Sequence, residues 1–404
     1  MRVSPVLSLT LAASLGLAPV AAHAASPPDV TAVAAKAAEP GPQDLERLKQ
    51  VGDAEANAVV DDLFARGQVA KVNQLLTRWK TNGQPLPEGL PPKLASFLES
   101  ARKLPAWVDP AALERAQRYA SQRHVPLVLT AVATATDHIR HPGSAAVLAG
   151  AVEGDQMPLM VAKVGKVLES QGRPGAFGPT GTAVVLWLKT RLVHAALNHL
   201  LLNSGHWDTA RFGVPFSQYA LLADWGAFFP YVLGVLERVD IPMTAQQEAD
   251  FIHMGRVAGH LLGVANVPTN PAEARRVHRL FEAEYAKATE DGAAVMAATV
   301  GAVAARTPLP DITKPLLSSM IRFMIGPREA DQLRLPKSPF WDGVVGRGLP
   351  VLLGLQAKVA DTGVPMGVLN ELVDAASNAV LAAGRSPELL LPTTLAAPGG
   401  RTGN

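Results

Sequence analysis

Apolar residues recur at spacings of three and four along most of this chain, which is the pattern of one face of an α-helix. The clearest stretch is 183–203, AVVLWLKTRLVHAALNHLLLN, which contains neither Gly nor Pro. We predict one long helix here, with His194 at its centre. The residues one turn away on the same face are Thr190, Arg191, Leu197 and Asn198.

The same periodicity predicts helices in nearly every other segment. Asp109 followed by Pro110 has the form of an N-cap and a first helical residue, and Thr244 is a second candidate N-cap. No run alternates apolar and polar residues as a half-buried strand would. We therefore predict an all-α, multi-helix globular fold. Helices are expected within 42–81, 95–104, 110–123, 125–140, 144–152, 157–170, 183–203, 219–236, 244–264, 271–289, 291–306, 315–336, 338–360 and 366–384.

The domain organisation follows from this pattern and from where Pro, Gly and small residues gather. We expect a helical N-terminal region over 43–99, which contains a Pro-rich linker at 83–94, and one helical catalytic domain over 100–385. A polar tail follows at 386–404.

The N-terminal segment has the features of a secretory signal peptide. Arg2 is followed by a largely apolar stretch at 6–20 and by Ala22-His23-Ala24, a small-x-small cleavage pattern. We expect residues 1–24 to be removed, 25–42 to form a flexible leader, and the protein to be secreted or periplasmic. No later segment carries about 18 uncharged apolar residues in a row, so no membrane span is expected.

Composition narrows the possible functions. The net charge is +2 and no dense Lys/Arg stripe is present, which argues against a nucleic-acid partner. The chain has no Cys, which excludes disulfides, thiolate metal sites and a Cys nucleophile. The motifs HExxH, GxSxG, Walker A and GxGxxG are absent.

The histidines supply most of the candidate chemistry. His194 in its apolar surround is either a hydrogen-bonded core residue, which is the commoner case, or a ligand to something buried. His199 is five residues further on and points about 140° away, so the two cannot share a metal ion on a straight helix. A haem would need an axial base, a flat apolar slot and a cationic partner for its propionates. His194 and Arg191 are the candidates for the base and the cation.

Two other histidine pairs carry weaker signals. His138 and His141 are three residues apart beside Asp137, a spacing that can ligate Zn or Fe. Because they stand next to a Pro-Gly break, we expect them to lie in an exposed loop. His253 and His260 share a helical face, but no carboxylate completes a metal site there.

Several segments, in this order, resemble the latex clearing proteins, which are secreted haem b rubber oxygenases, and the wider MpaB-like oxygenases. Leu188–Leu201, LKTRLVHAALNHLL, resembles the helix of that family whose central histidine is the proximal haem ligand, and this histidine falls on His194. The resemblance covers about residues 100–345. Its other segments are LPAWVD at 104–109, VPFSQYALLADWGAF at 214–228, HLLGVANVPTNPAEA at 260–274 and FMIGPREADQLRLP at 323–336.

The family also has a distal helix with an R-L-x-K-T pattern, which falls on MVAKV at 160–164. Lys163 matches the lysine that can occupy the distal iron position, whereas Met160 and Val164 replace the arginine and the threonine. Met160 is either a sulfur ligand or, as is commoner, a gap-filling core residue. With these two replacements, the distal side of the pocket is more apolar than in the family.

The resemblance implies a metal ligand in His194, cofactor contacts from Arg191, Met160 and Val164, and a catalytic role for Lys163. It implies non-covalent haem b and a dioxygenase that cleaves the double bonds of poly(cis-1,4-isoprene), or a similar apolar alkene, to aldehydes and ketones. The alternative is a diverged member that binds haem or an apolar ligand without cleaving rubber, suggested by Met160 and Val164.

Overall fold

The computed structural model describes residues 41–152, 156–362, 366–382 and 388–395, and throughout these residues the regular secondary structure is α-helical. The predicted all-α fold is thus confirmed. The predicted signal peptide and nearly all of the predicted leader lie outside the described residues. The helices are α2 (Pro42–Leu48), α3 (Ala54–Ala65), α4 (Val69–Leu76), α5 (Pro92–Ala101), α6 (Pro110–Gln122), α7 (His124–His138), α8 (Pro142–Ala151), α9 (Met157–Gln171), α10 (Ala183–Leu202), α11 (Thr209–Phe212), α12 (Gln218–Phe228), α13 (Pro230–Arg238), α14 (Ala245–Leu262), α15 (Pro271–Glu284), α16 (Glu290–Ala304), α17 (Pro310–Ile325), α18 (Pro327–Gln332), α19 (Pro339–Asp361) and α20 (Gly367–Ala382).

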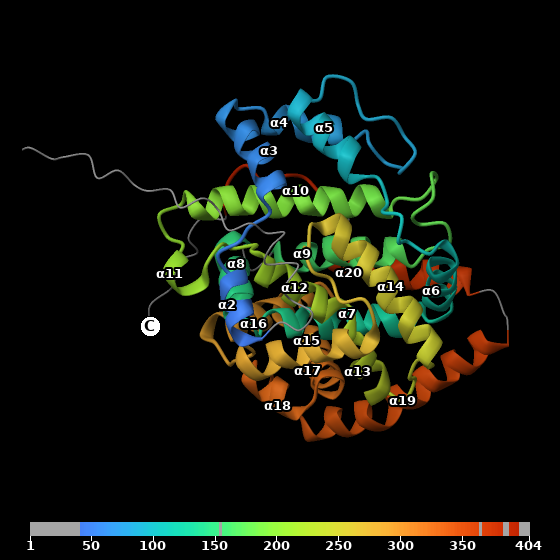
Figure 1. The fold of residues 1–404 in the computed structure, drawn as a ribbon. Helices are drawn as coiled ribbons and strands as arrows, with labels where there is room; N and C mark the ends of the chain where they lie inside the picture. The colour runs from blue at the N-terminus through green and yellow to red at the C-terminus, as the bar shows by residue number, and fades with distance from the viewer. Residues whose placement is uncertain (1–40, 153–155, 363–365, 383–387, 396–404) are drawn as a thin grey trace, which may run out of the picture.

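The predicted long helix around His194 is α10, and it lies across the molecule (Figure 1). Helices α3, α4 and α5 lie above it in that view, and most other helices lie below. Helix α10 packs against α3, α8, α9 and α14, so side chains bury its surface in several directions. This explains why apolar residues occur nearly all round it rather than in one stripe.

Local capping rules account for where several helices begin. Asp109 caps α6 by accepting a hydrogen bond from the backbone N–H of Ala111, as its sequence position predicts. Thr244 caps α14 by accepting a hydrogen bond from the backbone N–H of Gln247. In return, the Gln247 side chain accepts a hydrogen bond from the backbone N–H of Thr244 at 2.9 Å.

One predicted helix is two helices in the structure. The apolar run at 219–236 divides into α12 and α13 at Phe229, because Pro230 has no N–H to continue the hydrogen-bond ladder. By length and composition, Gln218–Arg238 would be able to cross a membrane, but 89% of its window is buried inside the protein. Such burial is typical of a core helix.

The two ends of the described chain are attached to the helical body. In the N-terminal region, the Nζ of Lys189 on α10 donates a hydrogen bond to the carbonyl oxygen of Trp79 at 2.8 Å. In the predicted polar tail, Leu391 is buried and exchanges two hydrogen bonds with the Asn73 side chain on α4, both at 2.9 Å. One continuous cluster of buried apolar residues extends from Leu45 to Leu391.

The buried amine of Lys189 predicts a pH dependence of stability. Burial lowers its pKa from 10.5 to about 8, so the unfolded chain binds more protons between those values and the free energy of unfolding rises with pH there. Relative to Lys189→Met, the wild type should gain up to about 3 kcal/mol from pH 8 to pH 10.5, as measured by urea unfolding. The exposed Lys71→Met should show no such difference. Parallel pH profiles for wild type and Lys189→Met would contradict the prediction.

Candidate cofactor site around His194

His194 lies half-buried in the middle of α10, and its imidazole has no hydrogen-bond partner among the described residues. The ring stacks on Phe216, with centroids 4.1 Å apart and planes 11° apart. Its Nδ1 atom is buried and unpartnered. An unsatisfied buried polar atom costs about 1–3 kcal/mol, so a ring in this state marks a position that a ligand would stabilise.

The backbone next to Phe216 is held by the residue one turn after His194. The Asn198 Oδ1 accepts a hydrogen bond from the backbone N–H of Phe216 at 2.8 Å, and its Nδ2 donates to Asn57 at 3.2 Å. Ser217 then caps α12 by accepting a bond from the N–H of Ala220. Phe216 is thereby fixed against one face of the imidazole, which restricts rotation of the ring.

Gln218 connects this segment to the end of α14. Its side chain donates to the carbonyl of Gly263 at 3.0 Å and accepts from the N–H of Ala265 at 2.8 Å. Gly263 has φ of 88°, and a Cβ there would lie 2.5 Å from Asp53 and 2.6 Å from Arg191. Only glycine fits this position. The two motifs Phe-Ser-Gln and Leu-Gly-Val thus form one structural unit beside α10.

A buried acidic residue lies near His194 that the sequence analysis did not single out. Asp224 on α12 forms an ion pair with His138 on α7, whose Nδ1 is 2.6 Å from the carboxylate oxygen. The expectation that His138 and His141 lie in an exposed loop is wrong, because they belong to the tightly packed end of α7 and the start of α8. The signal for Asp224 was a single carboxylate within an otherwise apolar helix.

The pKa values of His194 and His138 shift in opposite directions. Burial lowers the pKa of His194 to about 4, an effect that the charge of Asp224 only partly offsets. At neutral pH this imidazole is therefore uncharged and offers a lone pair. Burial also acts on His138, but the adjacent Asp224 carboxylate outweighs it and raises that pKa above its ordinary value.

Arg191 forms a bidentate ion pair with Asp53. Its Nε and Nη2 donate to the two carboxylate oxygens at 2.5 and 2.9 Å, and the guanidinium also lies over the ring of Phe97. The pair joins α10 to the N-cap of α3. The structure thus assigns Arg191 a contact that the sequence did not predict, and its role toward a cofactor remains a prediction.

Met160, Lys163 and Val164 share one face of α9, since they are spaced three and four residues apart. All three are half-buried, and α9 packs directly against α10. The structure therefore makes α9 and α10 neighbouring helices. The catalytic role of Lys163 and the cofactor contacts of Met160 and Val164 remain predictions.

The other histidines named above lie in different surroundings. His199 stacks on Phe64 and its Nδ1 lies 2.7 Å from Asp61, on the side of α10 that faces α3. His253 and His260 pack edge-on against Trp107, and the Nε2 of His253 accepts the N–H of Asp109. These contacts explain how the Leu-Pro-Ala-Trp-Val-Asp segment attaches to α14.

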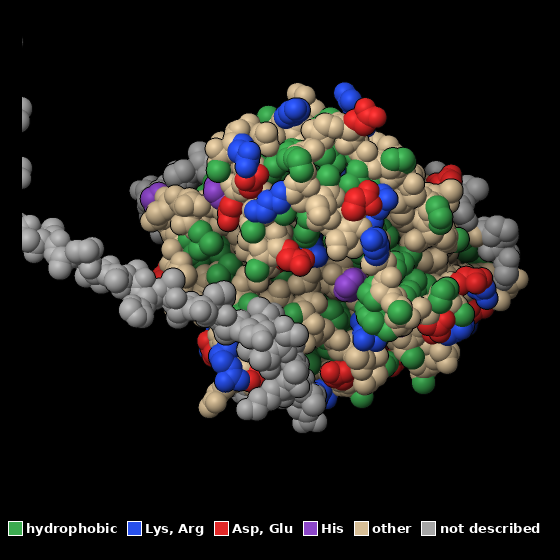
Figure 2. All heavy atoms as spheres, turned by 45° about the horizontal axis from the view of Figure 1, so that its top comes forward, with side chains coloured by type: hydrophobic (Ala, Val, Ile, Leu, Met, Phe, Trp, Pro, Cys, Tyr) green, Lys and Arg blue, Asp and Glu red, His purple; other side chains and the backbone are tan. Residues whose placement is uncertain are grey.

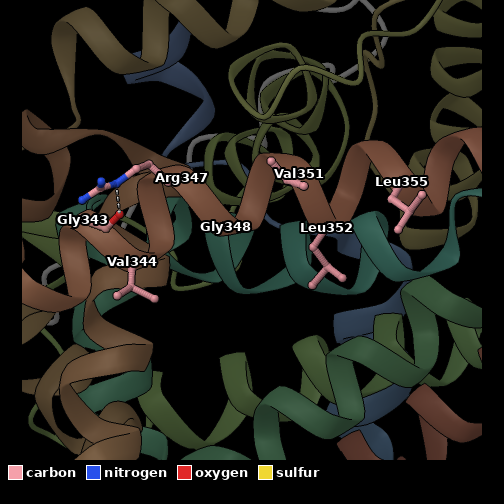
Figure 3. Close-up of a pocket in the computed structure, with 7 residues that line it drawn as sticks. All are labelled: Gly343, Val344, Arg347, Gly348, Val351, Leu352 and Leu355. Atoms are coloured by element: carbon pink, nitrogen blue, oxygen red, sulfur yellow. Dashed lines mark hydrogen bonds between the residues drawn. The ribbon is translucent and has the colours of Figure 1, made fainter.

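Two surface features lie outside this site. A shallow apolar hollow follows α19, and Figure 3 shows its lining residues spread along that helix alone. These are Gly343, Val344, Arg347, Gly348, Val351, Leu352 and Leu355. On the face that carries α3 to α5, Figure 2 shows acidic and basic side chains interspersed, without a large field of one sign.

Comparison with known proteins finds similarity to one family of oxygenases. The model of the "ER-bound oxygenase mpaB/B'/Rubber oxygenase, catalytic domain" matches residues 172–354. A rubber oxygenase of Streptomyces sp. (strain K30) is 28% identical over 311 residues, which are 76% of each chain. The solved structure of latex clearing protein in the closed state superposes with a TM-score of 0.74 at 26% identity, covering 85% of this chain and 95% of that one. In sequence and in fold the chain is thus similar to the rubber oxygenase and MpaB-like oxygenase family.

The match to this rubber oxygenase family covers the two sides of the site unequally. The catalytic-domain model includes His194, Phe216 and Asp224, whereas α9 precedes its first matched residue. The family thus has its clearest counterpart here in α10 and α12. Lys163 lies before the part of the chain that this model matches.

The ion pair between Arg191 and Asp53 predicts that substituting Asp53, at the start of α3, strongly lowers the stability of the protein. Asp53→Asn keeps the shape of the side chain but leaves Arg191 without its counter-charge, and should lower the free energy of unfolding by about 3 kcal/mol in urea denaturation. Glu55 lies 3.6 Å from the same guanidinium but is 78% exposed, so Glu55→Gln should cost less than about 0.5 kcal/mol. Equal effects of the two substitutions would show that the buried pair is not a major support of α10.

Proposed function

We propose that this protein is an exported haem b oxygenase that uses dioxygen to cleave carbon–carbon double bonds in poly(cis-1,4-isoprene) or a similar apolar alkene. The observation that carries the proposal is the half-buried His194, whose Nδ1 atom is buried without a hydrogen-bond partner, in the middle of a helix that the family model matches. Export belongs to the proposal because a solid polymer cannot enter a cell.

The residues present fit a haem with one axial histidine. The imidazole of His194 is neutral at physiological pH because burial lowers its pKa to about 4, and neutral imidazole is the form that ligates iron. Its ring plane is set by Phe216. No Cys is present, so a haem here would be held without thioether bonds.

The proposed reaction balances without a further reductant. One double bond breaks, the two atoms of dioxygen are added, and two carbonyl groups form: an aldehyde from the CH end and a ketone from the methyl-bearing end. Haem, when bound, supplies the redox chemistry for this insertion. Phe216 and Asn198 orient the axial base, and the helices around α10 exclude water.

Lys163 is the candidate catalytic residue, on the side of the proposed pocket opposite His194. Its place on α9 allows an ammonium group to act where Met160 and Val164 supply only apolar surface. We infer that Lys163 stabilises negative charge that develops on oxygen during bond cleavage, since a cation in a dry site interacts strongly with such charge.

The axial role of His194 predicts a spectroscopic result. Protein purified from cells supplied with haem should show a Soret band, and His194→Ala should lose most of it because the iron loses its protein ligand. His199→Ala is the matched control on the same helix and should retain haem, since His199 contacts Phe64 and Asp61 instead. Normal haem retention by His194→Ala would refute the assignment.

The catalytic role of Lys163 predicts that its substitution leaves haem binding intact and lowers the rate of polyisoprene cleavage. Lys163→Met should keep the haem, alter its absorption spectrum, and lower the rate of carbonyl formation from polyisoprene latex by about 100-fold, because one charge contact to the developing oxygen charge is lost. Lys166→Met, on the same helix, should retain the wild-type rate. Unchanged turnover in Lys163→Met would exclude the catalytic role.

A binding protein without rubber cleavage is the second candidate function. The observation that favours it is the apolar pair Met160 and Val164 in place of a cation and a hydroxyl on the face of α9. Incubation of haem-loaded protein with latex separates the two candidates. Carbonyl-bearing oligomers support the oxygenase, and their absence from a protein with a normal Soret band supports the binding protein.

A further inference from the structure

A second group of buried polar residues lies on the other side of the end of α7. Asp137 is on the last turn of α7, His141 is the N-cap residue of α8, and Glu282 is on α15. One ligand atom from each of these three side chains lies within 4.8 Å of the others. The side chain of Asp137 is completely buried and His141 is 2% exposed. The group thus combines two carboxylates and an imidazole inside the protein.

Each member of this group has one polar atom that is buried without a hydrogen-bond partner. These atoms are Oδ2 of Asp137, Nδ1 of His141 and Oε1 of Glu282. Most buried polar atoms in native proteins are satisfied, so three orphaned atoms in one cluster call for a common explanation. A bound cation would satisfy all three at once.

Arg140 orients the carboxylates of Asp137 and Glu282 by donating a hydrogen bond to each. Its Nη1 donates to Oδ1 of Asp137 at 2.9 Å and its Nη2 donates to Oε2 of Glu282 at 2.5 Å. Its Nε is held in turn by Gln332 at 3.0 Å. The guanidinium thus binds one oxygen of each carboxylate and leaves Oδ2 of Asp137 and Oε1 of Glu282 for a ligand. The Nδ1 atom of His278 lies 3.9 Å from that Asp137 oxygen. Hydrogen bonds of this kind typically set the direction of metal-ligating side chains.

The charges in the cluster also favour a cation. Burial, reinforced by the neighbouring Glu282 carboxylate, raises the pKa of Asp137 well above its ordinary value. Burial lowers the pKa of His141 to about 3, so its imidazole is neutral. Arg140 balances one of the two carboxylate charges, and the remaining charge is met either by a proton shared between Asp137 and Glu282 or by a positive ion. A divalent cation also uses the neutral imidazole.

We propose that Asp137, His141 and Glu282 bind one divalent cation of the Zn²⁺ or Mn²⁺ type, at a site separate from His194. One nitrogen and two oxygen ligands suit these ions, since imidazole and carboxylate are both among their usual donors. The ion would join the adjacent end of α7 and start of α8 to α15, which is distant in sequence. Its role is structural, because Asp137 and His141 are buried and the Glu282 side chain is only 25% exposed.

The position of the site gives it a consequence for the neighbouring pocket. His138 follows Asp137 directly on α7, and it is His138 that pairs with Asp224 beside His194. A cation that fixes Asp137 therefore also fixes the turn that holds His138. This effect does not depend on haem being bound, so the two proposals can fail independently.

The test is metal binding by the purified full-length protein. After dialysis against a chelator and loading with Zn²⁺ or Mn²⁺, elemental analysis should find roughly one equivalent per chain, and the midpoint of thermal unfolding should rise by about 5 °C at saturating metal. Iron is left out of the count, because haem would contribute to it. Wild-type protein that retains neither metal and shows no shift in midpoint would overturn the proposal and leave a proton shared by Asp137 and Glu282.

Matched variants locate the ion. Glu282→Gln removes one ligand charge at constant size and should reduce the bound metal at least tenfold. Glu284→Gln, at the exposed end of the same helix, should bind metal as the wild type does. Equal metal content in both variants would place the ion elsewhere and overturn the assignment. Electron paramagnetic resonance of bound Mn²⁺ gives a second readout, since its spectrum should change in His141→Ala only if His141 is a ligand.

Discussion

The burial of an uncharged imidazole in the middle of α10 is the constraint on which the rest of this structure depends. Helices from distant parts of the chain pack around His194 and leave it half-buried, and this removal from water lowers the pKa of the ring to about 4. The ring remains unpaired although an unmet hydrogen bond costs about 1–3 kcal/mol. A fold that keeps such a group needs compensation from packing elsewhere, and the continuous core on both sides of α10 supplies it.

The contacts around α10 also explain why the shared motifs of the family lie far apart in sequence. Phe216 stacks on His194, Gln218 binds the backbone at Gly263, and Gly263 leaves room for the Arg191–Asp53 pair. Each motif is therefore one side of a single junction between α3, α10, α12 and α14.

Much of the fold followed from local rules, whereas the polar interior did not. Periodicity located α10 to within a residue, and Asp109 and Thr244 act as the caps that their positions indicate. The same rules placed His138 and His141 in a loop, because a Pro-Gly pair marks a break in a helix without showing that the break is buried. The pairing of Arg191 with Asp53 joins residues 138 positions apart, so no local pattern predicts it. Asp224 has a local signal as the single carboxylate of an apolar helix, but its pairing with His138 on another helix is not predicted by any local pattern.

These long-range polar contacts are organised around the last turn of α7. Asp137 and Arg140 face α15, while His138 between them faces α12 and the site at His194. Consecutive residues on a helix point in different directions, so one turn can serve two buried polar groups at once. Any shift of this turn would disturb both groups together, because a close-packed interior transmits small displacements. We therefore regard the charge arrangement beside α15 as part of what positions the Asp224–His138 pair, and with it the electrostatic environment of His194.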